Sequence, residues 1–307
     1  MTERVPQPKE SEPAAKPVVS IILPFLNESR FIDEAIESVA AQTFTGWELL
    51  LVDDGSTDQS AVIARRHADA SGGRIRYLEH PGRANLGQGP TRNLGIGQSR
   101  GRYIAFLDAD DVWLKEKLQK QVAVLESHPD VGMTYGPYFL WYGWTGRAED
   151  EARDMRVEIG DAAIYDRVLP PPGILLSYIK TGGGLPAPCS VLLRRDVLEE
   201  VGAFEPQFPG MYDDEALFFK VMLRFPVFVT SERWDKYRQH DESFCERAIR
   251  AGLWHRDPHI LTPDKRRLLL WQRRYLDQCV APPHVRWRVG DELRDRMAAL
   301  GMPPAPG

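Results

Sequence analysis

An apolar run that ends in three aspartates constrains the fold of this chain more than any other feature of its sequence. The run covers residues 103–107, and Asp108, Asp110 and Asp111 follow it directly. A continuous apolar run is typical of a strand covered on both faces, and in open α/β sheets ligands bind at the carboxyl ends of such strands. Carboxylate oxygens there suit Mg²⁺ or Mn²⁺, with substrate phosphates completing the coordination shell. The alternative interpretation is a solvated turn in which Asp110 or Asp111 caps the next helix.

A second acidic cluster follows another predicted strand. Residues 47–52 form an apolar run that ends in Asp53 and Asp54, and Gly55 then permits a tight turn. Because the carboxyl ends of parallel strands lie at one edge of a sheet, we expect both clusters to face the same cleft. Capping can explain each cluster separately, but it does not explain why two strands end in the same way. A carboxylate of the Asp53-Asp54 cluster can bind a base or ribose, and one of the cluster at 108–111 can hold a metal that bridges a diphosphate.

Strands alternate with helices through the first 135 residues. Predicted strands cover 18–23, 47–52, 75–78, 103–107 and 131–135, and predicted helices cover 30–41, the segment around Val62 and Ile63, and 113–126. A glycine-rich loop that runs into a helix is expected at 87–97. This order predicts a parallel-type sheet with right-handed crossovers. Short strands at 190–193 and 227–229 and a helix at 214–224 are expected further along.

The second half of the chain is less regular. Residues 147–156 are dense in charge and have no clear period, and Pro-Pro-Pro-Gly at 170–173 marks a break. A long irregular insertion is more often a binding loop or lid than filler. From residue 246 the chain is arginine-rich and helical in pattern, with Trp254, Trp271 and Trp287. This region has two open interpretations: a basic surface near acidic lipid headgroups, or a solvated helical face with buried tryptophans.

Composition excludes several classes of protein. The formal net charge of -5 argues against binding to nucleic acid. Cys189, Cys245 and Cys279 lack the spacing of a zinc site or a disulfide framework, which favours a reducing, cytoplasmic compartment. No apolar stretch is long enough to span a bilayer. Residues 1–17 are polar and proline-rich, so we expect a disordered leader rather than a signal peptide.

Several motifs occur in the order in which glycosyltransferase family 2 carries them. They are VSIILPFLNE at 19–28, QTF at 42–44, VDDGSTD at 52–58, NLG at 85–87, TRNLG at 91–95 and FLDADD at 106–111, with a looser second half over 194–204 and 212–214. The chain closely resembles this family over residues 18–135. The resemblance implies a GT-A fold, which is a Rossmann-like α/β architecture with a mixed, mainly parallel sheet flanked by helices. It also implies inverting transfer of a sugar from a nucleotide-diphosphate donor.

The resemblance divides the chain and implies roles for individual residues. Residues 18–135 would form the nucleotide-sugar-binding half, 136–245 the acceptor-side half with its insertion loop, and 246–307 a C-terminal helical extension. Pro24 and Glu28 would line the nucleotide pocket. The predicted binding set further contains Phe25, Asn27, Asp53, Asp54, Asn85, Arg92, Asn93, Asp108, Ala109 and Arg238, with Asp54 on the base and Arg238 on the phosphates.

The residues closest to the chemistry are also implied by the resemblance. Asp108 and Asp110 occupy the DxD motif of the family, with Asp110 as the direct metal ligand. His240 would bind the metal or a phosphate, although a lone histidine is more often structural. Asp214 falls where the family places its general base. A Glu-Asp pair is commoner at that point than the Asp213-Asp214 pair of this chain, which leaves the choice between the two acids open.

The predicted reaction transfers one sugar from a UDP- or GDP-sugar to a hydroxyl of a glycan, a lipid-linked or a small-molecule acceptor, assisted by Mg²⁺ or Mn²⁺. One alternative is a nucleotidyltransferase that makes sugar nucleotides, but residues 24–29 lack its glycine-rich, basic signature. Another is a non-catalytic binding module, against which the intact acids at 108, 110 and 214 argue. Absence of a QxxRW motif disfavours processive synthesis. We expect a cytoplasmic protein, with peripheral contact at the inner face of the membrane left open.

Overall fold

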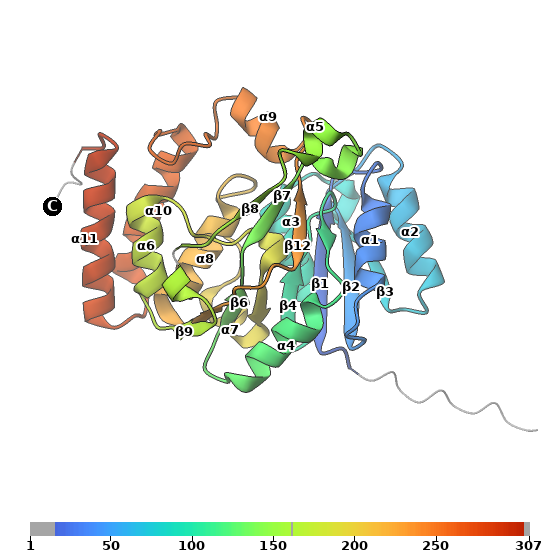
Figure 1. Cartoon of the computed structure of the whole chain (residues 1–307), viewed down its shortest axis with the longest axis horizontal. Coiled ribbons are helices and arrows are strands. Elements are labelled where there is room, and N and C mark those ends of the chain that lie inside the picture. The colour runs from blue at the N-terminus through green and yellow to red at the C-terminus, as the bar shows by residue number, and fades with distance from the viewer. Residues whose placement is uncertain (1–15, 161, 304–307) are drawn as a thin grey trace, which may run out of the picture.

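A mixed sheet of eight strands runs through the middle of the molecule (Figure 1). The computed structural model describes residues 16–160 and 162–303, so nearly all of the predicted leader at 1–17 lies outside the described residues. In spatial order the strands are β3 (Ile75–Glu79), β2 (Trp47–Asp53), β1 (Val19–Phe25), β4 (Tyr103–Phe106), β10 (Leu192–Arg194), β6 (Met133–Tyr135), β11 (Val227–Val229) and β9 (Arg167–Leu169). The first four pair in parallel, whereas β10 is antiparallel to both of its neighbours. The prediction of a mixed, mainly parallel α/β sheet is confirmed.

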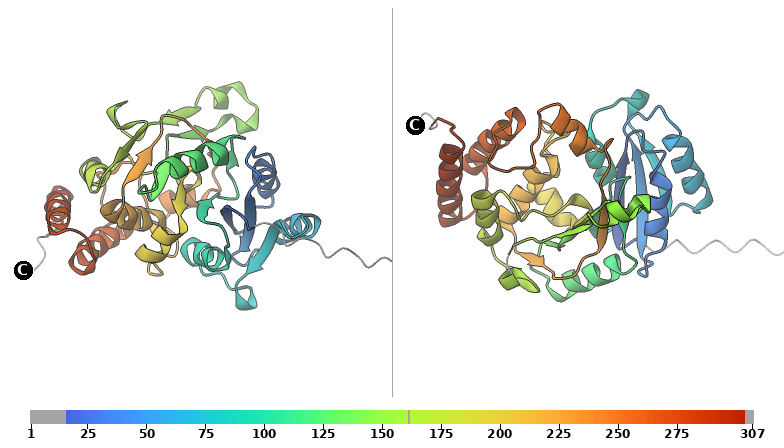
Figure 2. Two further views of the ribbon diagram at one scale, coloured as in Figure 1. Left: turned by 90° about the horizontal axis from the view of Figure 1, so that it is seen from below. Right: turned by 45° about the horizontal axis from the view of Figure 1, so that its top comes forward.

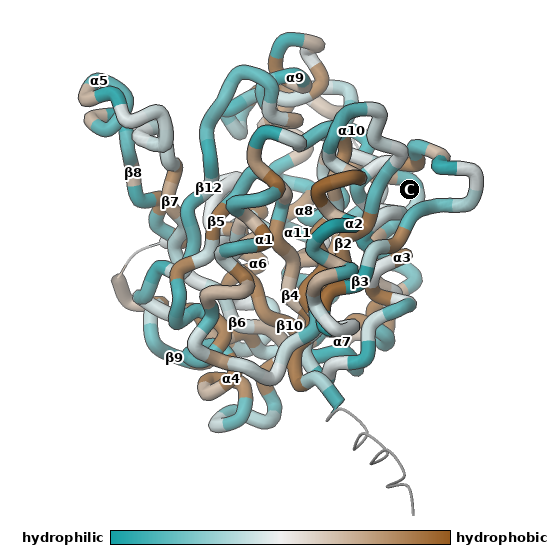
Figure 3. The backbone as a smooth tube through the Cα atoms, turned by 90° about the vertical axis from the view of Figure 1, so that its right-hand side faces the viewer, coloured by the Kyte–Doolittle hydropathy of each residue, from teal (hydrophilic) through white to brown (hydrophobic). Residues whose placement is uncertain are grey.

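Both faces of the sheet are covered, which explains why the side chains of its central strands are mainly apolar on both faces. Ile22 belongs to one buried cluster, while Ile21 and Leu23 belong to the cluster on the opposite face, as the alternation of side chains along a strand requires. The apolar strands β2 and β4 lie inside a shell of more hydrophilic helices and loops (Figure 3). The helices that follow the strands are α1 (Ile32–Ala40), α2 (Ser60–Ala70), α3 (Gln88–Gln98), α4 (Lys117–Ser127), α6 (Gly173–Thr181), α7 (Arg195–Val201) and α8 (Asp213–Arg224).

A second, four-stranded sheet corrects two expectations. It consists of β5 (Val112–Trp113), β12 (Asp235–Arg238), β7 (Tyr138–Trp141) and β8 (Met155–Val157). The helix predicted from residue 113 begins only at Lys117, because Val112 and Trp113 pair with β12 instead. Residues 147–156, for which no regular element is expected, include α5 (Ala148–Glu151) and the start of β8. Both elements are too short to leave a period in the sequence.

The glycine-rich stretch is also more regular than expected, since α3 begins at Gln88 and covers nearly all of it. Short 3-10 helices occupy Pro81–Arg83, Gly143–Thr145, Ala162–Ile164 and Pro188–Ser190.

The C-terminal part is helical, as its pattern predicts. It contains α9 (Phe244–Arg250), α10 (Pro263–Gln278) and α11 (Pro283–Ala299), and the last two lie beside α6 and α8 at the end of the molecule away from β3 (Figures 1 and 2). Trp271 is buried and packs against Phe208 and Phe219, whereas Trp287 is 72% exposed. The interpretation of Trp254 and Trp271 as buried tryptophans therefore holds for Trp271, whereas Trp254 is only partly buried. Among the described helices, none is both long and apolar enough to cross a membrane.

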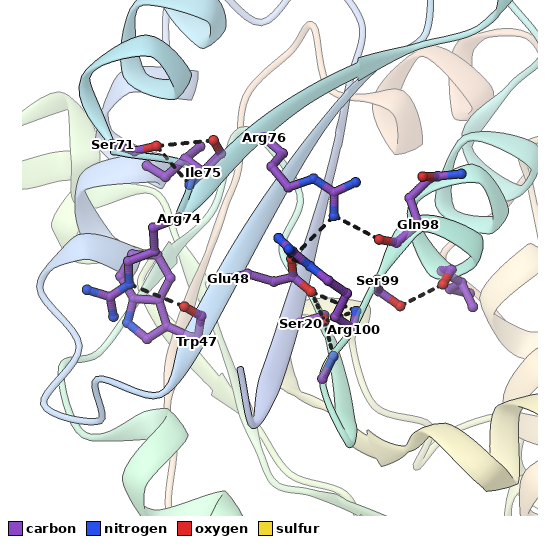
Figure 4. Close-up of polar contacts among 12 residues, drawn as sticks. Ser20, Trp47, Glu48, Ser71, Arg74, Ile75, Arg76, Gln98, Ser99 and Arg100 are labelled. Atoms are coloured by element: carbon purple, nitrogen blue, oxygen red, sulfur yellow. Dashed lines mark hydrogen bonds and ion pairs between the residues drawn. The ribbon is translucent and has the colours of Figure 1, made fainter. Parts of the chain in front are cut away.

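A buried carboxylate holds the amino ends of the strands together (Figure 4). Glu48 on β2 accepts hydrogen bonds from the Ser20 hydroxyl at 2.7 Å and from the backbone N–H of Arg100 at 2.7 Å. The guanidinium groups of Arg76 and Arg100 complete its partners. Burial raises the pKa of Glu48, but hydrogen bonds from Ser20 and Arg100 outweigh it, so the net pKa is lowered. This network lies at the end of the sheet opposite to the acidic clusters, so its role is structural.

Candidate active site

A pocket opens at the carboxyl edge of β1, β2 and β4, beneath the helix α9 that lies over this edge in Figure 1. We call it the donor pocket. Its empty space, open solvent included, is about 660 Å³. The predicted residues that line it are Pro24, Phe25, Glu28, Asp54, Asn85, Asp108, Ala109 and Asp110. Both acidic clusters therefore face one cleft, as their positions at the ends of parallel strands predict.

Asp54 organises the wall of the donor pocket. Its carboxylate accepts hydrogen bonds from the backbone N–H groups of Leu86 at 2.8 Å and Gly87 at 3.0 Å, and from the Thr91 hydroxyl at 3.0 Å. Gly87 has a φ of 93°, and a Cβ at this position would lie 2.1 Å from the carbonyl oxygen of Pro209. Only glycine therefore allows this loop to approach both Asp54 and Pro209. Contact of Asp54 with a base stays a prediction.

Glu28 and Arg247 bring a carboxyl group and a cation into the donor pocket. The pKa of Glu28 is raised to about 8, first by burial and then by the charge of Asp110, while Arg247 lowers it. Glu28 is therefore largely protonated at neutral pH and can donate a hydrogen bond. Arg247, which the sequence analysis missed, lines the pocket from α9. No local pattern marks it among the many arginines of this region, and α9 begins before the predicted boundary at 245/246.

A second pocket adjoins the donor pocket, and we call it the acceptor-side pocket. The two share Asp108 and Asp110, and the acceptor-side pocket is also lined by Asp213, Asp214 and Tyr237. The general-base candidates of α8 thus line a pocket that meets the donor pocket at the DxD motif. A group entering from either side reaches the same two aspartates.

The buried Arg92 side chain lies between Asp108 and Asp213. It is 1% exposed, and its guanidinium donates to Asp213 Oδ2 at 2.6 Å and to Asp108 Oδ1 at 2.7 Å. Burial opposes ionisation of Arg92, but the two carboxylates outweigh it and raise its pKa. Both terminal nitrogens are therefore engaged within the protein, and Arg92 holds the DxD motif against α8.

The structure distinguishes the two acids at the start of α8. Asp213 is 3% exposed and bound to Arg92, and burial raises its pKa to about 7 although Arg92 lowers it. Asp214 is partly exposed, and among the described residues its carboxylate accepts one hydrogen bond, from the adjacent Glu215 N–H to Oδ1 at 2.8 Å. Burial also raises the pKa of Asp214. Of the pair, Asp214 keeps an oxygen free for a proton from an acceptor, and a raised pKa suits a general base.

Asp110 and Asp111 face different partners. Asp110 Oδ2 lies 3.1 Å from His240 Nε2, while Asp111 is buried and its Oδ1 accepts the backbone N–H of Arg238 at 2.9 Å. The capping interpretation for Asp110 or Asp111 is wrong, because α4 begins at Lys117 after Glu116.

The residues around the DxD motif fit a hard divalent cation. The described chain contains no group of three or more histidine, cysteine, aspartate or glutamate side chains that could hold a metal by themselves. Mg²⁺ or Mn²⁺ needs only one or two protein carboxylates when a substrate diphosphate supplies further oxygens, so Asp110 with Asp108 is sufficient. His240 fits less well. Its buried Nδ1 has no hydrogen-bond partner among the described residues, whereas a metal-bound imidazole ordinarily donates its other N–H.

Arg238 and three other predicted residues serve the framework in this structure. The Arg238 guanidinium donates to the Asp110 carbonyl oxygen at 2.6 Å and to Glu34 at 2.5 Å, so its pairing with phosphate stays a prediction. Three more predicted residues do not line the donor pocket. Asn27 accepts from Thr57 N–H at 2.8 Å, Asp53 accepts from Ser56 N–H at 2.8 Å, and Asn93 exchanges two hydrogen bonds with the backbone of Phe204.

Comparison with known proteins agrees with this geometry. An uncharacterised glycosyltransferase of Rickettsia felis is 29% identical over 255 residues, covering 81% of this chain and 39% of that protein. The UDP-Glc:alpha-D-GlcNAc-diphosphoundecaprenol beta-1,3-glucosyltransferase WfgD of Escherichia coli is 36% identical over 121 residues, covering 39% of this chain and 46% of that protein. The chain thus spans less than half the length of both relatives.

Solved structures share the fold. TarS 1-349 of S. aureus in complex with UDP-GlcNAc has a TM-score of 0.64 at 17% identity, over 91% of this chain and 72% of that one. The mannosyltransferase PcManGT of Pyrobaculum calidifontis, in complex with GDP-Man and Mn²⁺, has a TM-score of 0.54 at 16% identity, over 94% of this chain and 76% of that one. These likenesses identify the GT-A fold that the sequence predicts.

The family model "Glycosyl transferase family 2" matches residues 20–202, which include the Asp53-Asp54 cluster, the DxD motif and most of the large sheet. The chain belongs to glycosyltransferase family 2.

Proposed function

We propose that the protein transfers a single sugar from a nucleotide-diphosphate sugar to an acceptor hydroxyl with inversion at the anomeric carbon. The observation that carries this proposal is the meeting of the donor and acceptor-side pockets at Asp108 and Asp110, with Asp214 free on the acceptor side. A nucleotidyltransferase needs no base on the far side of the sugar, and a binding module needs neither a second pocket nor a base.

In the proposed reaction the acceptor oxygen attacks the anomeric carbon from the side of Asp214. Asp214 takes the hydroxyl proton as the new C–O bond forms, and the bond from the anomeric carbon to the diphosphate oxygen breaks on the opposite face. The products are the glycosylated acceptor, a protonated Asp214 and the nucleoside diphosphate. A single displacement inverts the anomeric centre, and one base is sufficient for it.

The diphosphate needs positive charge as it departs. A cation held by Asp110 and Asp108 would supply Lewis-acid stabilisation of the leaving diphosphate when bound. Arg247 supports the same proposal from the protein side, because it lines the donor pocket and its charge acts on Glu28. We propose that Arg247 binds the diphosphate, in place of Arg238, whose guanidinium is already engaged by Glu34 and the Asp110 carbonyl.

The donor we propose is a UDP- or GDP-sugar, since the structural neighbours hold UDP-GlcNAc and GDP-Man in the same fold. The acceptor hydroxyl belongs to a glycan, a lipid-linked or a small-molecule substrate. We further propose a cytoplasmic site of action, which the three unpaired cysteines support.

Donor hydrolysis and transfer test the proposal directly. Wild-type protein, with Mn²⁺ and each of UDP- and GDP-sugars, should release nucleoside diphosphate, and Asp214→Asn should lose at least about a hundredfold in turnover while binding the donor as before. Asp196→Asn is the matched control, because Asp196 also sits in the first turn of a helix and accepts the next N–H, at 3.0 Å, but is exposed on α7. Release of pyrophosphate from a nucleoside triphosphate would favour a nucleotidyltransferase, and binding without turnover would favour a binding module.

A further inference from the structure

A third cavity lies among the C-terminal helices, separate from the donor pocket. We call it the C-terminal pocket. It is enclosed by α6, the first turn of α8, the segment 254–258, α10 and α11, which lie side by side in Figures 1 and 2. Leu268, Leu269 and Leu293 line it and are buried. Its lining also includes the polar side chains of Lys265, Gln272 and Arg296.

Two cations face this cavity without a carboxylate partner. Arg296 is 7% exposed and donates only to the backbone carbonyls of Lys180 and Pro258 and toward the ring of His259. Lys265 also donates to the Pro258 carbonyl. Neither cation forms an ion pair anywhere in the part of the chain that the structure describes, whereas the exposed Arg267 of the same α10 pairs with its neighbour Asp264. Burial and the charge of Arg296 lower the pKa of Lys265, and they outweigh the charges of Glu215 and Asp257, which raise it. Arg296 is buried and Lys265 is half-buried, they share one carbonyl oxygen, and among the described residues neither has a carboxylate within ion-pair distance.

A buried amide in the same wall also lacks a partner. Gln272 is 1% exposed, lies two helical turns after Lys265 on the same face of α10, and its Nε2 has no hydrogen bond within the described chain. Buried donors are ordinarily satisfied, so an unpartnered one that lines a cavity indicates a group that enters the cavity. A ligand oxygen would satisfy Gln272 and neutralise Lys265 and Arg296 together.

The acidic group of the cavity does not cancel this charge. Glu215 lines the pocket, accepts the Tyr178 hydroxyl, and has its pKa raised to about 7, first by burial and then by Asp214. It contributes at most one negative charge against the two cations. The remaining charged neighbour on the wall, Arg256, is already paired with Glu246.

The position of the pocket connects it with the acceptor. Tyr212 lines both the C-terminal pocket and the acceptor-side pocket, and Glu215 directly follows Asp214 in α8. We infer that the C-terminal pocket binds a phosphate group of the acceptor, held by Lys265, Arg296 and Gln272, while an acceptor hydroxyl reaches Asp214. That the ligand is an acceptor substrate rests on the proposed function. That the ligand carries a phosphate group rests on the cavity alone.

Inorganic phosphate in metal-free buffer is the first probe, with binding followed by titration calorimetry and by the thermal unfolding midpoint at constant ionic strength. Wild-type protein should bind phosphate, and Lys265→Met and Gln272→Glu should each weaken binding about tenfold or more, because each removes or opposes a charged hydrogen bond. Gln272→Glu keeps the shape of the side chain and should fold normally beside two cations. Arg294→Gln is the matched control, since Arg294 lies on α11 but is exposed and paired with Asp291.

The second arm compares transfer to sugar 1-phosphates with transfer to the same free sugars. Wild type should prefer the phosphate-bearing acceptor through KM, and both pocket variants should lose that preference. Two results would overturn the inference. One is that wild type does not bind phosphate. The other is that Lys265→Met and Gln272→Glu leave binding intact while Arg247→Gln removes it, because phosphate would then occupy the donor pocket only. Failure of the proposed function has a different signature: wild type would bind phosphate in the C-terminal pocket but hydrolyse no nucleotide-sugar, which would overturn the assignment to an acceptor.

Discussion

Replacement of Arg92 by methionine should destabilise the protein in a manner that depends on pH. Methionine keeps much of the volume of the arginine side chain but removes the cation between Asp108 and Asp213. Removing one partner of a buried ion pair costs about 3–5 kcal/mol where the other group stays charged, so we expect a cost of this size only above about pH 7, where Asp213 is ionised in wild type. Asp213 is 3% exposed and carries most of this cost, whereas the Asp108 side chain is 20% exposed and is partly relieved by solvent. Since domains are stable by about 5–15 kcal/mol, the variant should still fold, but marginally.

The pH dependence follows from the pKa of Asp213. In wild type this pKa is raised to about 7, so the native state binds a proton that an unfolded aspartate releases near pH 4. Arg92 lowers the pKa, and its removal must raise it further. Below about pH 6 both proteins carry a neutral Asp213, and the stability difference is constant. Above pH 7 only the variant keeps binding the proton, so the difference should grow by as much as about 1.4 kcal/mol per pH unit until the new pKa is reached.

Urea unfolding monitored by tryptophan fluorescence between pH 5.5 and 9 measures this difference. Arg294→Met, which removes an exposed ion pair, should cost less than about 1 kcal/mol at every pH. Adding Asp213→Asn to Arg92→Met should restore part of the stability at pH 8 and abolish the pH dependence. A cost below about 1 kcal/mol at pH 8, or a double variant without such rescue, would refute the role of Arg92 as the bridge between DxD motif and α8.

Three further outcomes are expected. Glu48→Gln should lower the free energy of unfolding by about 1–3 kcal/mol at pH 7. Because the pKa of Glu48 is lowered on folding, its contribution to stability is present above about pH 4.3 and is lost as the pH falls below it. The urea midpoints of wild type and variant should therefore converge in acid. Gly87→Ala should lower the free energy of unfolding by about 1–3 kcal/mol and weaken nucleoside diphosphate binding in a thermal-shift assay. The reason is that Gly87 has a φ of 93° and an added Cβ would lie 2.1 Å from the Pro209 carbonyl oxygen. Unchanged stability and unchanged binding would contradict this close contact. Arg247→Gln should raise the Kd for the nucleoside diphosphate about tenfold at unchanged stability, while Arg250→Gln, exposed on the same helix, should not; equal effects would remove Arg247 from the donor pocket.

Much of the fold is legible in local patterns. The mainly apolar runs at 18–23, 47–52 and 103–107 predict β1, β2 and β4 within two residues, because a strand buried on both faces carries apolar side chains at most of its positions. Ser20 and Glu48 are the polar exceptions in these runs. The position of the acids directly after two of these runs predicts their meeting at one cleft, since parallel strands end at one edge of a sheet. Neither inference requires knowledge of distant contacts.

Errors occur where pairing with distant chain decides the structure. Val112 and Trp113 form a strand because β12 lies beside them, and residues 235–238 are more than a hundred positions away. Without a partner, two residues carry no strand signal, so the sequence favours an early start of the helix that follows.

The sequence alone determined that this chain builds an α/β sheet with acidic groups at one edge, because periodicity and strand ends are local properties. The tertiary structure decided which of the polar residues pair with each other and which face the two pockets. Packing turned Arg92 and Arg238 toward carboxylates of the protein itself, left Asp214 free beside Asp213, and brought Arg247 over the donor pocket. A side chain's role depends on which distant groups share its surroundings, and a one-dimensional pattern does not record them.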